Sequence, residues 1–93
     1  MSGLKRFVYV ITTATHPEAF YVGVTSNVPA RLAEHNAGHC PHTLRRRPWQ
    51  LHVALAFTHE ATALRFERYL KAGSGRAFAK RHFSASGDAE RSS

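Results

Sequence analysis

The segment YVGVTSNVPARLAEH, residues 21 to 35, places a phenol, a guanidinium and an imidazole close together in the sequence. Such groups can donate hydrogen bonds and exchange protons. Tyr21 and Gly23 point to the same side of a strand, and Gly23 leaves a gap that another backbone or a ligand can enter. Arg31 and His35 share one face of a helix. These residues either pack and face solvent or line one site.

Glu67 is a separate candidate for chemistry, on a predicted helix from Glu60 to Ala72. At about 100° per residue the apolar side chains gather on one side, and Glu67 projects at its margin. A carboxylate in that position needs a partner, because losing its hydration is costly. It can pair with Arg31 or Lys71, reach water, or bind a hard cation such as Mg²⁺ together with waters and phosphate oxygens.

Three segments have the composition of β-strands. Residues 5–13 (KRFVYVITT), 20–25 (FYVGVT) and 49–57 (WQLHVALAF) are rich in β-branched and aromatic residues. The turn ATHPEA joins the first two in a predicted β-hairpin, which brings Tyr9 close to Tyr21 if the register permits. The third strand is apolar enough to be central or well covered.

Three helices complete the predicted fold. Asn27 caps a helix that runs to about Ala37, with Gly38 as a left-handed cap, and residues 39–48 are a loop. Thr58 caps the helix to Ala72, which Gly73 ends, and residues 75–83 form a short basic helix.

The order β-β-α-β-α-α predicts a small α/β fold, in which helices flank a mostly antiparallel three-stranded sheet. Residues 1–83 are expected to form one domain, and residues 84–93 a disordered tail.

The composition indicates a basic globular protein. The chain has 13 Lys plus Arg against 6 Asp plus Glu, and its formal net charge is +7. This excess favours a polyanionic partner, above all nucleic acid, although it can also serve solubility or a membrane surface. No segment is apolar enough for a membrane helix, and the N-terminus lacks the apolar core of a secretory signal. We therefore expect a cytoplasmic protein that does not bind membranes and is a monomer or a weak homodimer.

Taken together, these motifs resemble the GIY-YIG nuclease superfamily. VYV at 8–10 and YVG at 21–23 are similar to the two halves of its signature, although Phe7 or Val8 replaces the first glycine. Arg31, His35 and Glu67 fall where the family carries its arginine, a histidine or tyrosine, and its metal-binding glutamate. The resemblance runs from about Phe7 to Phe83, and LKAGSGRAF is similar to a small bacterial subgroup of stand-alone domains.

The resemblance implies a divalent-metal-dependent endonuclease that hydrolyses phosphodiester bonds in DNA, in repair or turnover. It implies Mg²⁺ or Mn²⁺ at Glu67, a phosphate contact from Arg31, and hydrogen bonds from Tyr21 to the water or the phosphate. Tyr9 would orient or deprotonate the attacking water, and His35 would assist proton transfer or hold Tyr9. Because a free phenol has a pKa of about 10, a phenolate here needs nearby positive charge. Which of the two is the base stays open.

Several further residues are candidates for nucleic-acid contacts. The basic loop and the later helices can hold backbone phosphates, although cations there can also face solvent or compensate helix ends. The predicted nucleic-acid-binding residues are Gly23, Arg45, Arg46, Arg47, Lys71 and Arg76.

Many active family members carry a late asparagine, whereas this chain has no asparagine after Asn36. The alternative is therefore a noncatalytic nucleic-acid-binding module that keeps the fold. A small protein-interaction domain is a third hypothesis. DNA versus RNA, and any preferred substrate structure, stay open.

Overall fold

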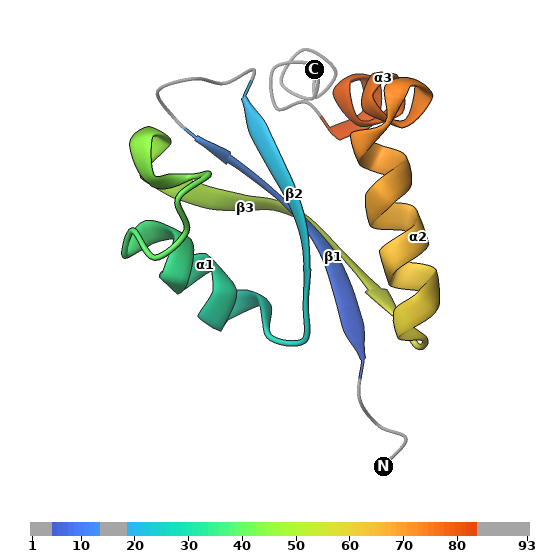
Figure 1. Cartoon of the computed structure of the whole chain (residues 1–93), viewed down its shortest axis with the longest axis horizontal. Coiled ribbons are helices and arrows are strands. Elements are labelled where there is room, and N and C mark those ends of the chain that lie inside the picture. Colours follow the sequence, from blue (N-terminus) through green and yellow to red (C-terminus); the bar gives the residue numbers. More distant parts are fainter. Residues whose placement is uncertain (1–4, 14–18, 84–93) are drawn as a thin grey trace, which may run out of the picture.

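The computed structural model describes residues 5–13 and 19–83. Strands β1 (Arg6–Thr13), β2 (Phe20–Thr25) and β3 (Trp49–Phe57) form one antiparallel sheet in the order β2-β1-β3. In Figure 1 the three strands cross the middle of the molecule, with α1 on one side and α2 and α3 on the other. The predicted α/β fold and its element order are confirmed. Most of the predicted hairpin turn and the predicted tail, 84–93, lie outside the described residues.

Helix α1 (Val28–Asn36) begins and ends as its sequence predicts. Oδ1 of Asn27 accepts a hydrogen bond from the backbone N–H of Ala30 at 3.0 Å, which satisfies one of the free donors of the first turn. After the helix, Gly38 adopts a φ of 86°, a left-handed conformation that favours glycine. These two local signals fix the length of the helix that carries Arg31 and His35.

The other helices differ from their predicted starts. Helix α2 (Glu60–Lys71) begins after His59, so the prediction that Thr58 is its cap was wrong. Two residues are needed to turn the chain after β3, and this turn leaves Thr58 outside the helix. Helix α3 (Gly73–Phe83) begins two residues earlier than predicted. The basic loop before β3 contains a short 3₁₀ helix, η1 (Leu44–Arg46), where we expected only irregular structure.

The two faces of the sheet pack against different helices. Val8 and Val10 belong to an apolar core with residues of α2 and α3, whereas Tyr9 and Ile11 pack with residues of α1 and with Trp49. This alternation follows from the two-residue period of a strand. The edge strand β2 lies between α1 and the pair of α2 and α3 (Figure 1), and its residues are buried or half-buried.

A β-bulge interrupts the pairing of β1 with β3. Val10 pairs with Val53 and the next residue, Ile11, pairs with Leu51, so His52 is an additional residue on β3. A bulge of this kind bends the strand and changes the face to which the following side chains point. Trp49, beyond the bulge, therefore joins the core on the α1 side.

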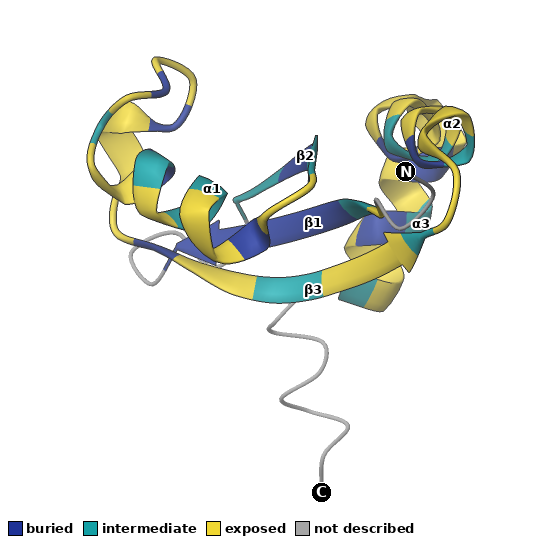
Figure 2. Cartoon of the chain, turned by 90° about the horizontal axis from the view of Figure 1, so that it is seen from below, coloured by how far each residue is buried: buried dark blue, intermediate teal, exposed yellow. Residues whose placement is uncertain are grey.

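The prediction that the third strand is central or well covered was wrong. Strand β3 is an edge strand, and Leu51 and Leu55 on it are 43% and 36% exposed. Figure 2 shows the contrast between the buried β1 and the largely exposed β3. Apolar composition is similar in the two strands, so it could not show which of them hydrogen-bonds on both sides. No helix among the described residues is long and apolar enough to cross a membrane.

Candidate active site

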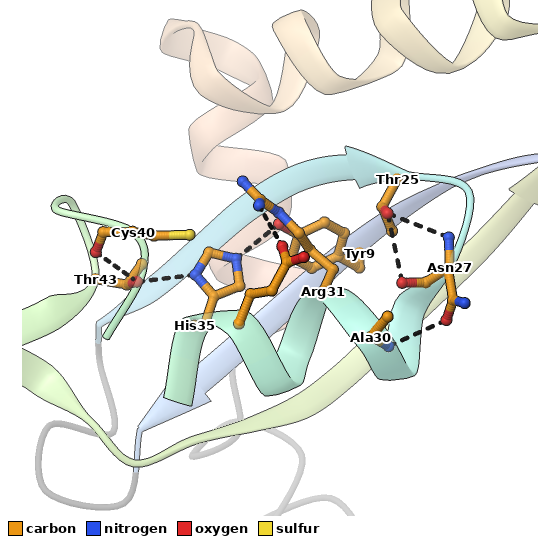
Figure 3. Close-up of polar contacts among 9 residues, drawn as sticks. Tyr9, Thr25, Asn27, Ala30, Arg31, His35, Cys40 and Thr43 are labelled. Carbon is orange, nitrogen blue, oxygen red and sulfur yellow. Dashed lines mark hydrogen bonds and ion pairs between the residues drawn. The ribbon is translucent and has the colours of Figure 1, made fainter. Parts of the chain in front are cut away.

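A chain of hydrogen bonds links β1, α1 and the loop before β3. The hydroxyl of Tyr9 lies 2.8 Å from Nε2 of His35, and Nδ1 of His35 lies 2.8 Å from Oγ1 of Thr43. The Thr43 hydroxyl donates to the backbone carbonyl of Cys40 at 3.3 Å. Figure 3 shows this chain of contacts. Tyr9, His35 and Thr43 are each at most 2% exposed, so their polar atoms depend on one another for hydrogen bonds.

The direction of these bonds determines where the proton of His35 lies. The hydroxyl of Thr43 has one proton, and it is donated to Cys40, so the hydroxyl oxygen acts as an acceptor towards His35. Nδ1 of His35 therefore carries the proton of the neutral ring. Nε2 is left with a lone pair, and it accepts the hydrogen bond from the hydroxyl of Tyr9. The phenol thus faces a base.

Burial keeps both partners uncharged. Burial raises the pKa of Tyr9, and the neighbouring Arg31 opposes this effect without overcoming it. The pKa of His35 is lowered by burial and then by the charge of Arg31. The positive charge that a phenolate requires is thus present, but Tyr9 is a neutral phenol at rest.

Arg31 lies on the same side of α1 as His35, as the four-residue spacing predicts. One of its Nη1 hydrogens is donated to Oε1 of Glu34 at 2.7 Å, an ion pair within the helix. This bond, and a weaker interaction with Tyr9, raise the pKa of Arg31. The guanidinium has five donors, so those not engaged by Glu34 remain able to hold an anion beside Tyr9.

The two signature tyrosines share one face of the sheet. Tyr9 pairs with Gly23 across β1 and β2, and the ring centroids of Tyr9 and Tyr21 are 6.4 Å apart. Tyr21 also meets the ring of His35 edge-on, at 5.1 Å between centroids. The predicted common side of Tyr21, Gly23 and Tyr9 is confirmed.

The gap beside Gly23 is filled by the ring of Tyr9. A methyl group at Gly23 would lie 2.6 Å from Cζ of Tyr9 and would collide with its hydroxyl. Gly23 thus admits the Tyr9 ring, and a direct contact of Gly23 with nucleic acid stays a prediction.

Glu67 lies beside this group rather than within its hydrogen-bond chain. Its Oε2 is 2.6 Å from Nζ of Lys71, one turn later on α2, as one of the alternatives from the sequence anticipated. Nζ of Lys71 lies 5.5 Å from the centroid of the Tyr21 ring. The Glu67 side chain is 17% exposed. The structure therefore joins Tyr9, Tyr21, Arg31 and His35 by direct contacts, and it connects Glu67 to them through Lys71.

Only part of the predicted basic surface lies next to Tyr21. Arg46, Lys71 and Arg76 line a pocket that also contains Tyr21, whereas Arg45 and Arg47 do not line it. Arg47 instead donates to the backbone carbonyls of Leu44 and Asn36, at 2.9 and 3.4 Å, and so ties the loop to the end of α1.

Two contributors to this region were not identified from the sequence. Thr43 orients His35, but an isolated threonine in a polar loop gives no local signal of burial. Glu34 pairs with Arg31, and the three-residue spacing of opposite charges could have revealed it. Lys80, a cation of the last helix that could either extend the basic surface or compensate the helix end, lines the pocket with Tyr21.

Asn36 holds the loop against the end of α1. Its Oδ1 accepts from the backbone N–H of Trp49 at 2.6 Å, and its Nδ2 donates to the carbonyl of Trp49 at 3.0 Å. The indole Nε1 of Trp49 donates to the carbonyl of Thr43 at 2.8 Å. These bonds fix Thr43, and through it the ring of His35.

Among the described residues, no group of three or more His, Cys, Asp and Glu side chains is placed to hold a metal ion. A cation bound by Glu67 would therefore depend on waters and on its substrate for its other ligands, which is a common arrangement for Mg²⁺.

Comparisons with known proteins agree with this geometry. The family model of the GIY-YIG catalytic domain matches residues 5–82. UPF0213 protein SH2523 of Staphylococcus haemolyticus is 37% identical over 68 residues, which cover 72% of this chain and 80% of that protein. The solution NMR structure of UPF0213 protein BH0048 from Bacillus halodurans superposes with a TM-score of 0.52 at 21% identity, covering 91% of this chain and 93% of that one.

A more distant similarity reaches eukaryotic enzymes. The structure-specific endonuclease subunit SLX1 of Scheffersomyces stipitis is 39% identical over 67 residues, and that of Chaetomium globosum is 36% identical over 66 residues. The matched part covers 64% of this chain but only 20% of either SLX1 protein. The family model and the small bacterial relatives extend over most of the sequence, and so the chain belongs to the GIY-YIG family of nuclease domains.

Proposed function

We propose that this chain is an endonuclease that hydrolyses phosphodiester bonds in DNA with a divalent metal ion, Mg²⁺ or Mn²⁺. The observation that carries the proposal is the 2.8 Å hydrogen bond between the buried hydroxyl of Tyr9 and Nε2 of His35, beside the cation of Arg31. A phenol in this position can take a proton from a water molecule while it passes its own proton to the imidazole. Tyr9 and His35 thus act together as the base.

The other side chains suit the charge that develops during hydrolysis. Arg31 binds the scissile phosphate with the donors that Glu34 leaves free, and it stabilises the negative charge that grows on the phosphate oxygens. Tyr21 donates a hydrogen bond to the same phosphate or to the attacking water. Thr43 holds His35 in the tautomer that can receive the proton.

Glu67 is the residue that would hold the metal ion. GIY-YIG nucleases generally use a divalent metal, and one carboxylate with waters and phosphate oxygens is a sufficient set of ligands for Mg²⁺. The ion supplies charge stabilisation of the leaving oxygen when it is bound. Lys71, the ion-pair partner of Glu67, then becomes available for an adjacent phosphate.

The substrate class is DNA, with branched, nicked or damaged structures as the first candidates and RNA as the alternative. The basic charge of the chain and its similarity to structure-specific endonuclease subunits support this assignment. We place its action in DNA repair or turnover in the cytoplasm. The residues proposed to contact nucleic acid outside the catalytic group are Gly23, Arg45, Arg46, Arg47, Lys71 and Arg76.

A second candidate function is a noncatalytic nucleic-acid-binding module. The ion pair of Lys71 with Glu67 favours it, because an ammonium 2.6 Å from the carboxylate competes with any metal ion. The absence of an asparagine after Asn36 points in the same direction. The two candidates differ at Glu67, since hydrolysis requires the carboxylate whereas binding should tolerate its removal or improve.

The test is cleavage of supercoiled and branched DNA, and of RNA, by purified protein in Mg²⁺, in Mn²⁺ and with a chelator. We expect metal-dependent cleavage that Tyr9→Phe and Glu67→Ala each reduce at least about a hundredfold. Glu60→Ala is the matched control, because it removes an exposed carboxylate from the same helix and should leave the rate unchanged.

Cleavage that survives both Tyr9→Phe and Glu67→Ala would contradict the nuclease assignment and would indicate a contaminant. Binding without cleavage, retained in Glu67→Ala, would instead support the noncatalytic module.

A further inference from the structure

A pocket of about 690 Å³ lies outside the hydrogen-bond chain, at the edge of β2 that pairs with no other described strand. Its walls come from Phe20, Tyr21 and Val22 on that strand, from the end of α2 and the middle of α3, and from Arg46 on η1. Its size is within the range of pockets that bind small molecules, about 300–1,000 Å³. Parts of the chain distant in sequence thus form one concave surface.

One part of the pocket is strongly cationic. Arg46, Lys71, Arg76 and Lys80 line it, and no Asp or Glu does. Lys71 pairs with Glu67, but the other three have no acidic partner among the residues that the structure describes. Cations from three different elements around one cavity provide an environment for more than one negative charge.

The remaining wall is apolar. Phe20, Val22, Leu70 and Ala77 contribute to the lining, with the ring of Tyr21 at one side. A bare phosphate or sulfate leaves such a wall without a partner. A nucleotide matches both parts, because its phosphate is an anion and its base has a flat apolar face that packs on aromatic and aliphatic side chains.

The pocket is continuous with the candidate active site. Tyr21 lines the pocket and also touches the ring of His35, at 5.1 Å between centroids. Lys71 lines the pocket and binds Glu67 at 2.6 Å. A strand whose phosphate lies at Arg31 and Glu67 therefore has its neighbouring nucleotide at the pocket.

We propose that this pocket binds an unpaired nucleotide next to the scissile phosphate, with its base against the apolar wall that includes Phe20 and the flanking phosphates at Arg46, Arg76 and Lys80. In a duplex the bases are stacked and paired, so only the sugar-phosphate backbone can face the pocket and the apolar wall stays unmatched. The substrate is thus single-stranded at this position. The inference rests on the proposed function for the position of the scissile phosphate.

The test measures the affinity of the chain for a short, fluorescently labelled DNA strand by fluorescence anisotropy. A chelator is present so that the strand is not cleaved. The sequence offers a matched pair of double variants. Arg46 and Lys80 line the pocket, whereas Arg65 and Arg81, which are also exposed, do not. Each pair removes two positive charges, so the net charge of the chain falls equally in both variants.

We expect Arg46→Ala/Lys80→Ala to weaken binding about tenfold or more, and Arg65→Ala/Arg81→Ala to weaken it less than about threefold. Loss of two phosphate contacts should also reduce the slope of log affinity against log salt by about 1.4. All four side chains are exposed, and circular dichroism with thermal unfolding checks that both variants fold.

Equal weakening by the two double variants would overturn the proposal. The proposal would also fail if a blunt duplex bound as tightly as the single strand. It would fail as well if a free deoxynucleoside monophosphate displaced the strand at concentrations near the dissociation constant of the strand, because the flanking phosphates would then contribute nothing. A chain that binds by this pattern without cleaving DNA would disprove the nuclease function while the pocket assignment stands.

Discussion

Opposite faces of the same strand carry different chemistry. On one face of β1, Val8 and Val10 are at most 1% exposed and pack only against apolar side chains of β2, β3, α2 and α3. On the other face, Tyr9 is equally buried but donates a hydrogen bond to His35, which in turn depends on Thr43. Burial alone therefore does not distinguish the core from the candidate site.

The difference lies in what each face loses when one atom is removed. An apolar side chain contributes free energy of folding roughly in proportion to the area it buries, so shortening it costs stability. A buried phenol that is hydrogen-bonded to a neutral imidazole adds little net stability, but it places a proton next to a base. Changes on the apolar face should thus affect stability alone, whereas changes on the polar face should also affect activity.

The variant with the largest expected effect is Tyr9→Phe, which tests the polar face of β1. It removes the hydroxyl that faces Nε2 of His35, so we expect the rate of DNA cleavage to fall about 10²- to 10⁴-fold. Because Nε2 is left buried without a partner, the free energy of unfolding should also fall by about 1–3 kcal/mol. Cleavage kinetics and urea unfolding measure the two effects separately. An undiminished rate would remove Tyr9 from the mechanism.

Gly23→Ala should damage the polar face through its shape. The added methyl group would lie 2.6 Å from Cζ of Tyr9, so the ring must move away from His35. We expect a loss of about 1–3 kcal/mol of stability, together with at least about a tenfold loss of cleavage rate. Gly73→Ala is the control, since nothing lies within 4 Å of a methyl group there, and it should leave the rate as it is. Similar behaviour of the two variants would refute the contact.

Val10→Ala tests the apolar face. It deletes two buried methyl groups from a side chain that is 1% exposed, so the free energy of unfolding should fall by roughly 2 kcal/mol. The cleavage rate per folded molecule should not change, because Val10 points away from Tyr9. Thermal unfolding and an activity assay well below the melting temperature check both expectations. A large loss of activity with normal stability would reverse the assigned roles of the two faces.

The smallest expected effect is a dependence of stability on pH. Burial and the charge of Arg31 hold the pKa of His35 below its ordinary value of 6.5, so the unfolded chain binds a proton more readily than the folded one. The stabilisation is complete above pH 6.5 and is lost as the pH falls through the lowered pKa. Urea unfolding below pH 6.5 should show a shallower decline in His35→Gln than in wild type. Parallel curves would show that other groups cause the decline.

Local sequence was sufficient for most of the fold because the decisive signals are local. The β-branched runs, the cap at Asn27 and the left-handed Gly38 act within a few residues, and the structure has the expected strands and first helix. The sequence did not show that β3 lies at the edge of the sheet. Strand order depends on how the helices pack on the folded sheet, which no single segment determines. The cap of α2 was missed because the chain needs Thr58 to turn.

The candidate site was predictable where the period of a strand or helix determines the direction in which its side chains point. Strand and helix periods place Tyr21 with Gly23 and Arg31 with His35, and the hairpin register then brings Tyr9 opposite Gly23. Thr43 was not predictable, because its burial depends on the path of a loop that is held by Asn36 and Trp49. Likewise, only the folded chain shows that Lys80 and Arg46 line one pocket.

The bulge in β3 decides to which face of the sheet the side chains on its far side point. Tyr9 pairs with Ala54, and Thr13 pairs with Trp49. The two pairs are four residues apart on β1 but five residues apart on β3. Without the bulge, Ile11 would pair with His52, Gln50 would take the place opposite Thr13, and the indole of Trp49 would turn towards the other side of the sheet. The loop would then lose its bond from Trp49, and Thr43 could not hold the imidazole. The orientation of a proton acceptor on α1 thus depends on one extra residue in a neighbouring strand.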